Sequence, residues 1–148
     1  LYSYCIERQL KPEARKDIIE LLEQLKIIPN AMIDVSDGLS SEIFHLCKGS
    51  EVGCDVYEEK LPADPQTSST AEDFKINSST ALLNGGEDYE LLMAIRTEDY
   101  EKIKGHPLLT TIGHFTDQKQ VCNLVTGLGQ SIPLEAQGWK NFNKGASA

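Results

Sequence analysis

The sequence predicts an α/β (α+β) fold in which helices pack on a mixed β-sheet. Helical and extended segments alternate along the first part of the chain, whereas two extended segments follow each other near its end. The composition, with 40% hydrophobic and 25% charged residues, is that of a globular protein and argues against disorder, collagen and fibres. A length of 148 residues is expected to form one domain with its own core.

The first four predicted elements are a helix, a strand, a helix and a strand. Residues 12–27 are expected to be helical, because Pro12 suits a first helical position and apolar residues recur at the spacing of one helix face. A short buried strand is predicted at residues 31–33, and a helix follows from residue 39 to about residue 48. Residues 54–58 have the pattern of a second strand.

The second half of the chain is expected to contain weaker helices and three strands. Two prolines exclude a central strand at residues 61–65. The elements predicted after them are helical segments at 71–74 and 78–83, a strand at 87–95, a helix at 97–105, and strands at 110–115 and 121–126 joined by a polar turn.

The charge balance and the lack of long apolar runs limit the partners that we expect. Acidic residues outnumber basic residues by 23 to 14, which argues against a uniformly basic nucleic-acid-binding surface. No apolar run approaches the roughly 18–20 residues that span a bilayer, and there is no signal-peptide pattern. We therefore expect a cytoplasmic protein that binds neither nucleic acid nor membranes.

The four cysteines, Cys5, Cys47, Cys54 and Cys122, include no Cys-x-x-Cys pair, and the three histidines add no spaced metal signature. This pattern argues against a zinc site built from cysteine and histidine. Two disulfides would need an oxidising compartment, which nothing in the sequence indicates. The simpler interpretation is reduced thiols, with Cys47 and Cys54 as small buried hydrophobic residues.

A polar segment, Asp34-Val35-Ser36-Asp37-Gly38, lies between the predicted strand at 31–33 and a helix N-terminus. Ligands of α/β proteins gather at the carboxyl ends of strands, and helix N-termini attract phosphate. Asp34 and Asp37 could hold Mg²⁺, which prefers oxygen ligands, and Ser36 could bind a phosphate. Alternatively, these residues only cap the helix, since serine and aspartate are favoured at that position.

A second polar segment, Gly85–Glu90, carries carboxylates on Glu87, Asp88 and Glu90. In a strand, Asp88 and Glu90 would share one face and Glu87 would lie on the other. Burying three like charges without partners is costly, so they are expected to face solvent, a basic partner, a metal ion or a cationic ligand. The alternative is a solvated strand end.

These two segments resemble the paired motifs of the thiamine-monophosphate kinase family, within the superfamily related to aminoimidazole ribonucleotide synthetase. The segments Pro12–Arg15, Ile112-Gly113 and Gly138–Phe142 extend the resemblance along the chain. It implies the C-terminal domain fold of that superfamily, a mixed sheet with helices packed on it. The chain does not begin with methionine, and we expect residues 1–148 to be the C-terminal domain of a two-domain kinase, without its N-terminal ATP-binding and dimerisation domain.

The resemblance also implies a reaction and site residues. The reaction is transfer of the γ-phosphoryl group of ATP to thiamine monophosphate, with Mg²⁺ as cofactor, by a homodimer formed through the N-terminal domain. Asp34 and Asp37 match Mg²⁺ ligands, and Ser36 matches a residue that contacts ATP. The matching substrate contacts, where carboxylates and an aromatic face suit the cationic thiazolium, are Glu87 or Asp88 and Trp139 or Phe142.

Other interpretations stay open. The chain could be a non-catalytic nucleotide- or metal-binding domain, and we expect no appreciable kinase activity from it alone because half of the implied site is absent. It could also be another enzyme of the superfamily, such as a purine-biosynthetic synthetase, although the Asp-x-Ser-Asp-Gly turn argues against that. Trp139 could instead be a core residue or an anchor of the chain end.

Overall fold

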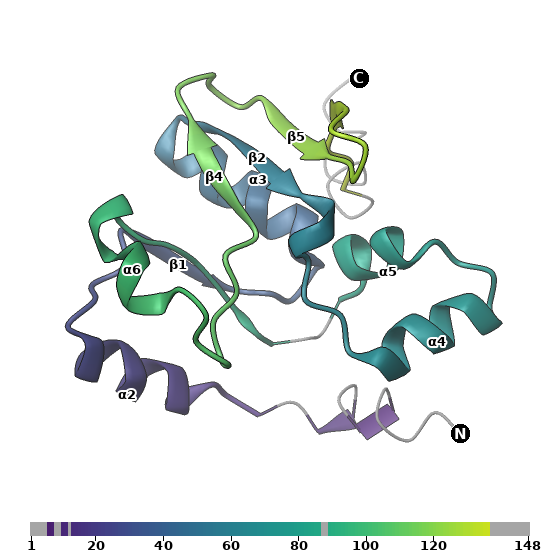
Figure 1. Cartoon of the computed structure of the whole chain (residues 1–148), viewed down its shortest axis with the longest axis horizontal. Coiled ribbons are helices and arrows are strands. Elements are labelled where there is room, and N and C mark those ends of the chain that lie inside the picture. The colour runs from purple at the N-terminus through teal and green to yellow at the C-terminus, as the bar shows by residue number, and fades with distance from the viewer. Residues whose placement is uncertain (1–5, 8–9, 12, 87–88, 137–148) are drawn as a thin grey trace, which may run out of the picture.

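The computed structural model of the chain describes residues 6–7, 10–11, 13–86 and 89–136 (Figure 1). Its helices and strands are, in chain order, α2 (Lys16–Leu25), β1 (Ala31–Asp34), α3 (Leu39–Ser50), β2 (Gly53–Tyr57), α4 (Pro65–Asp73), α5 (Ser78–Asn84), β3 (Leu91–Ala94), α6 (Tyr100–Ile103), β4 (Gly113–Thr116), β5 (Cys122–Val125) and β6 (Ser131–Pro133). Short 3-10 helices cover Glu58–Lys60 and Thr97–Asp99. The predicted α/β (α+β) class is therefore confirmed.

Four strands form a mixed sheet in the order β4-β2-β5-β6. β2 is antiparallel to β4 and parallel to β5, and β6 extends the sheet antiparallel to β5. α3 packs on this sheet (Figure 1) and contributes Ile43 and Cys47 to the main core. The buried residues of this core are Ile43, Cys47, Cys54, Val56, Leu61, Leu83, Cys122, Leu124 and Leu134.

β1 and β3 form a second, two-stranded antiparallel sheet. Ala31 pairs with Ala94 at one end of this sheet, and Asp34 pairs with Leu91 at the other. α2 packs against β3 through a second core, whose buried residues are Ile18, Leu22, Ile27 and Ile103. The strands that the sequence assigned to a single sheet are thus divided between two.

Two strands near the candidate site differ from the prediction. The strand expected at 87–95 is shorter, because Tyr89 has a φ of 50°, which interrupts an extended backbone, and β3 begins only at Leu91. Of its three carboxylates, Glu90 precedes β3, and Glu87 and Asp88 lie outside the described residues. The strand expected at 31–33 includes Asp34 and is not fully buried, since Met32 is 42% exposed.

Three helices also differ in length from the prediction. α2 ends at Leu25 because Lys26 adopts the left-handed conformation, and Pro12 lies outside the described residues. α4 begins earlier than the predicted signal, since the carboxylate of Asp64 accepts a hydrogen bond from the N–H of Gln66 at 2.7 Å and caps the helix. The helix expected at 97–105 is a 3-10 turn followed by the short α6.

The two strands expected near the C-terminal end, β4 and β5, form but do not pair with each other. β2 lies between them, so the polar turn that joins them spans a strand instead of making a hairpin. β6 was not predicted, because it is short and includes Pro133, which is tolerated at a sheet edge.

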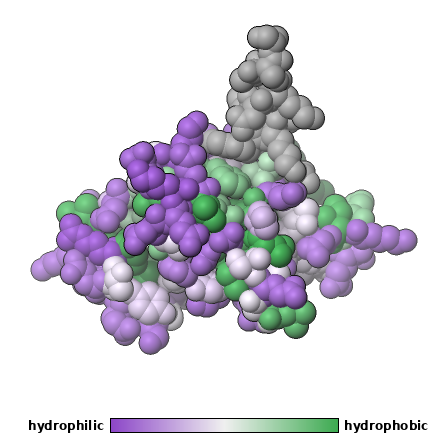
Figure 2. Space-filling model, turned by 90° about the horizontal axis from the view of Figure 1, so that it is seen from above, coloured by the Kyte–Doolittle hydropathy of each residue, from purple (hydrophilic) through white to green (hydrophobic). Residues whose placement is uncertain are grey.

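Hydrophilic side chains cover much of the face shown in Figure 2, with hydrophobic areas among them. Large exposed hydrophobic residues such as Ile28 and Leu128 come from different parts of the chain. Single residues of this kind are normal on protein surfaces. In the part of the chain that the structure describes, no helix is both long and apolar enough to cross a bilayer.

Candidate functional site

The first polar motif forms the turn between β1 and α3. Asp34 is the last residue of β1, and Gly38 is the N-cap of α3. The side chains of Asp34 and Asp37 are exposed, whereas Val35 is buried and anchors the turn. Among the described residues, neither carboxylate forms an ion pair with a basic side chain. Two carboxylates therefore face solvent beside a helix N-terminus, where they can bind a cation.

The alternative that Ser36 and Asp37 only cap α3 is wrong, because the N-cap is Gly38 and no side chain caps the helix. Instead, a carboxylate of the helix reaches back to the turn. Oε1 of Glu42 accepts hydrogen bonds from the backbone N–H of Asp37 at 3.2 Å and from Oγ of Ser36 at 3.4 Å. Glu42 is 3% exposed, so it holds the turn from inside the protein.

The role of Glu42 was not predicted from the sequence. Its one local signal is an acidic residue in the first turn of a helix, where the helix dipole favours negative charge. That signal is common and does not specify what the carboxylate contacts. The contact with Ser36 and Asp37 depends on how the turn folds back over α3.

The second polar motif lies directly against the first. The backbone N–H of Val35 donates a hydrogen bond to the carbonyl oxygen of Glu90 at 2.8 Å, and the N–H of Tyr89 donates to the carbonyl oxygen of Val35 at 2.9 Å. A Cβ atom on Gly86 would lie 2.8 Å from the carbonyl oxygen of Ser36. Glycine is thus required here, because the two backbones approach too closely for a side chain.

Arg15, which precedes α2, connects a third segment to the second motif. Its Nη1 contacts a carboxylate oxygen of Glu90, and its Nε and Nη2 donate to the two carboxylate oxygens of Asp17 at 3.0 and 2.9 Å. The hydrogen bonds with Arg15 hold the pKa of Asp17 below its ordinary value, and they raise the pKa of Arg15. Glu90 therefore has a basic partner, which is one of the surroundings expected for these carboxylates.

All four predicted substrate contacts lie outside the described residues: Glu87, Asp88, Trp139 and Phe142. Their roles stay predictions. The structure describes Asp34, Ser36 and Asp37 and brings them together in one turn beside the backbone of Tyr89 and Glu90.

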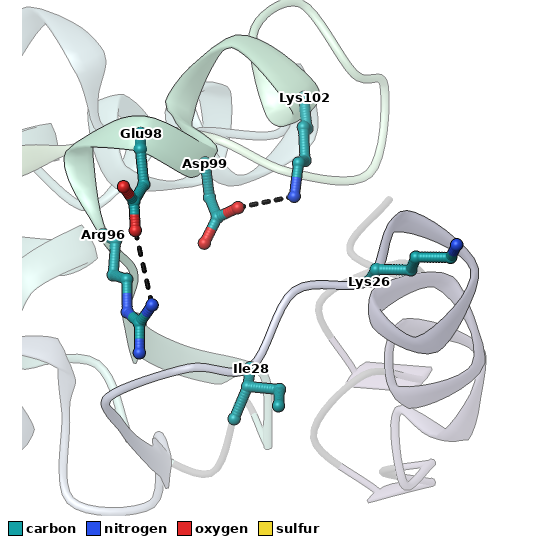
Figure 3. A pocket seen from close by; sticks show the side chains of 6 residues that line it. All are labelled: Lys26, Ile28, Arg96, Glu98, Asp99 and Lys102. Carbon is teal, nitrogen blue, oxygen red and sulfur yellow. Dashed lines mark hydrogen bonds and ion pairs between the residues drawn. The ribbon is translucent and has the colours of Figure 1, made fainter.

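A pocket elsewhere on the molecule is distinct from this turn (Figure 3). It lies beyond the end of the β1–β3 sheet at which Ala31 pairs with Ala94, whereas Asp34 is at the other end. Ion pairs of 3.3 and 2.6 Å within the pocket engage both of its carboxylates. The residues that line it are Lys26, Ile28, Arg96, Glu98, Asp99 and Lys102.

Three cysteines far apart in the sequence meet in the main core. Cys47, Cys54 and Cys122 are buried and form no disulfide, and their Sγ atoms all lie within 4.8 Å of one another. Hydrogen bonding with Cys54 lowers the pKa of Cys47 to about 7. The same hydrogen bond, together with burial, raises the pKa of Cys54, and burial raises the pKa of Cys122 to about 11. The expected burial of Cys47 and Cys54 is confirmed.

Sequence relatives indicate a family, although no protein-family model matches the chain. The thiamine-monophosphate kinase of Aquifex aeolicus is 31% identical over 140 residues, which cover 93% of this chain and 41% of the relative. That of Buchnera aphidicola subsp. Schizaphis graminum is 34% identical over 146 residues, which cover 95% of this chain and 43% of the relative. The chain thus spans about two fifths of the length of the curated relatives that it matches.

Solved structures agree with the sequence relatives. The Aquifex aeolicus kinase matches with a TM-score of 0.66 and 30% identity, over 86% of this chain and 40% of that chain. AaThiL complexed with AMPPCP and TMP matches with a TM-score of 0.67 and 30% identity, over 86% of this chain and 38% of that chain. Escherichia coli HypE, a hydrogenase maturation protein, has a TM-score of 0.66 but only 20% identity over 80% of this chain and 38% of its own, and shares the fold. The chain is therefore homologous to the thiamine-monophosphate kinases and corresponds to about two fifths of their length.

Proposed function

We propose that this chain supplies one half of the active site of a thiamine-monophosphate kinase. In this proposal, residues 1–148 are the C-terminal domain of a larger enzyme, whose N-terminal domain binds ATP and forms a homodimer. The reaction transfers the γ-phosphoryl group of ATP to thiamine monophosphate and yields thiamine diphosphate and ADP. The observation that carries the proposal is the contact between the two acidic motifs, through the hydrogen bonds of Val35, in a chain homologous to these kinases.

Asp34 and Asp37 are proposed to hold Mg²⁺. Two exposed carboxylates that form no ion pair with other described residues fit this ion, which is commonly held by one or two carboxylates together with substrate phosphates. When bound, Mg²⁺ would neutralise charge on the phosphates during phosphoryl transfer. This role explains how a chain with a net charge of −9 can serve two phosphorylated substrates.

Ser36 is proposed to contact ATP. Its hydroxyl donates a hydrogen bond to Glu42 at 3.4 Å, which is long for a hydroxyl donor. A phosphate oxygen beside the N-terminus of α3 would be a better acceptor, and the hydroxyl can rotate toward it. Glu42 keeps the backbone of the turn in place through the N–H of Asp37 while Ser36 changes partner.

The cationic thiazolium is proposed to meet Glu87 or Asp88, with Trp139 or Phe142 packing on it. The choice of Glu87 or Asp88 over Glu90 is supported by Arg15, because Arg15 already pairs with Glu90. A carboxylate that is neutralised by an arginine attracts a second cation less strongly. The remaining carboxylates of the second motif are therefore better suited to the positive ring.

Formation of thiamine diphosphate from ATP and thiamine monophosphate tests the proposal. We expect no appreciable turnover by the 148-residue chain alone, and Mg²⁺-dependent turnover by the complete protein. Asp37→Asn in the complete protein should lower activity by at least about 100-fold. The control Asp117→Asn, in the exposed turn between β4 and β5, should leave activity unchanged.

Four results would contradict the proposal. Robust turnover by the chain alone would exclude a half-site, and wild-type activity with unaltered Mg²⁺ dependence in Asp37→Asn would exclude the ligand assignment. Binding of ATP and Mg²⁺ by the complete protein without any turnover would indicate the non-catalytic alternative. Turnover of a purine precursor instead of thiamine monophosphate would indicate another superfamily enzyme.

A further inference from the structure

Three thiols converge in the main core from three different elements. Cys47 comes from α3, and Cys54 and Cys122 are register partners on the parallel strands β2 and β5. Their Sγ atoms all lie within 4.8 Å of one another. With sulfur–element bonds of about 2.3 Å, the length of zinc–thiolate bonds, the sulfurs of a planar three-coordinate site lie about 4 Å apart, and those of a pyramidal site lie somewhat closer. The three side chains would therefore need only small shifts to hold one atom.

The surroundings of these sulfurs are apolar. The three cysteines are 1%, 4% and 6% exposed, and they pack with aliphatic residues of the same core such as Val56 and Leu124. No histidine or carboxylate among the described residues joins the group. Within the described part of the chain, the cluster thus offers three sulfur ligands and no fourth one, whereas structural zinc sites take four.

Charge decides which element fits such a site. Three thiolates around a monovalent ion leave a net charge of −2, and three around a divalent ion leave −1. Either charge would be buried in an apolar core, at a large cost in free energy. Three thiolates around a trivalent element form a neutral unit, which an apolar core accommodates. Soft thiolate ligands also select thiophilic elements over those that prefer oxygen.

We propose that Cys47, Cys54 and Cys122 form a three-thiol site for a trivalent thiophilic element, supplied in solution as arsenous acid. The balanced step is As(OH)₃ plus three cysteine thiols giving As(S-Cys)₃ plus three water molecules. Three arsenic–oxygen bonds break and three arsenic–sulfur bonds form, and each thiol proton leaves with a hydroxide as water. Arsenic and sulfur keep their oxidation states, so no oxidant or reductant is needed.

Burial of the cluster predicts how binding proceeds. Arsenous acid reaches the sulfurs only when the core opens locally. The edge strand β6, which pairs with β5, is only 3 residues long, and we expect the core to open there. We therefore expect slow binding that accelerates in urea concentrations below the unfolding transition. Once formed, the bonds link α3 to two strands of the sheet and should raise the thermal midpoint of unfolding.

The experiment uses the full chain with the substitution Cys5→Ser. The three cysteines of the cluster are then the only cysteines in this sequence. The reduced protein is incubated with arsenous acid and studied by native mass spectrometry and by X-ray absorption at the arsenic edge. We expect one arsenic atom per chain with the loss of three hydrogens, and three sulfur neighbours around arsenic. Alanine in place of Cys47, Cys54 or Cys122 should weaken binding by at least about tenfold.

Two controls separate loss of a ligand from loss of folding. Val56→Ala truncates a residue that is 3% exposed in the same core but keeps all three thiols, and it should bind arsenic as the parent does. Phenylarsine oxide, which needs only two thiols, should still bind each single alanine variant if its core remains folded. Arsenic with only two sulfur neighbours, or undiminished binding by Cys54→Ala or Cys122→Ala, would overturn the proposal. Tighter binding of Zn²⁺ than of arsenous acid would overturn the charge argument.

Discussion

The buried carboxylate of Glu42 accepts a hydrogen bond from the backbone N–H of Asp37 at 3.2 Å, and so it holds the turn between β1 and α3. Glu42→Ala would leave this N–H and the hydroxyl of Ser36 without their acceptor. We expect it to lower the free energy of unfolding by about 1–3 kcal/mol, as measured by urea denaturation.

Two variants control for this loss. Glu42→Gln keeps an oxygen acceptor and should lose less stability than Glu42→Ala. Glu20→Ala, at an exposed position of α2, should change the free energy of unfolding by no more than about 0.5 kcal/mol. Equal stability of Glu42→Ala and Glu20→Ala would show that the hydrogen bond does not stabilise the turn.

The space around two glycines predicts opposite effects of alanine substitution on stability. A Cβ atom on Gly86 would lie 2.8 Å from the carbonyl oxygen of Ser36, so Gly86→Ala must displace one backbone and should cost about 1–3 kcal/mol. Gly49 lies within α3, and a Cβ atom there would meet no neighbouring atom within 4 Å, so Gly49→Ala should stabilise the protein by about 0.5–1 kcal/mol. Thermal and urea denaturation of both variants measure this contrast, and a stabilising Gly86→Ala would exclude the close approach.

The ion pair of Arg15 with Asp17 predicts a pH dependence. A carboxyl group whose pKa is lower in the folded than in the unfolded state stabilises the fold above its unfolded pKa, and this contribution is lost as the pH falls through the lowered value. In Arg15→Gln, the pKa of Asp17 should rise toward its ordinary value of 3.8, and stability should depend less on pH in the acid range. An NMR titration of Asp17 measures the change. Lys16→Gln removes a neighbouring charge without removing the hydrogen bonds and should leave the pKa of Asp17 low.

The exposed carboxylates of the candidate Mg²⁺ site should matter little for stability. Asp37→Ala removes a side chain that does not cap α3, so without Mg²⁺ the free energy of unfolding should change by no more than about 0.5 kcal/mol. Asp64→Ala removes a carboxylate that does cap α4 and should cost about 1 kcal/mol. Urea denaturation of the two variants compares them directly. If Asp37→Ala proves the more costly, then Asp37 has a structural role that the geometry does not show.

Local signals in the sequence were sufficient for the parts of the protein that local interactions build. The apolar spacing of α2 and α3 predicted both helices, because a helix buries one face whatever its partner is. The turn from Asp34 to Gly38 predicted the position of the candidate cation site, since its carboxylates are set by adjacent residues. The cap of α4 at Asp64 and Pro65 was also a local signal, although the predicted helix began later.

The tertiary structure decided every feature that joins distant segments. It placed β2 between β4 and β5, aligned Cys54 with Cys122, and set Arg15 against Glu90. The sequence alone determined most of the helical and extended segments and the positions of the acidic turns, because those properties depend largely on neighbouring residues. The choice of strand partners, the positive φ of Tyr89 that shortens β3, and the gathering of three thiols depend on which surfaces bury one another once the whole chain is folded.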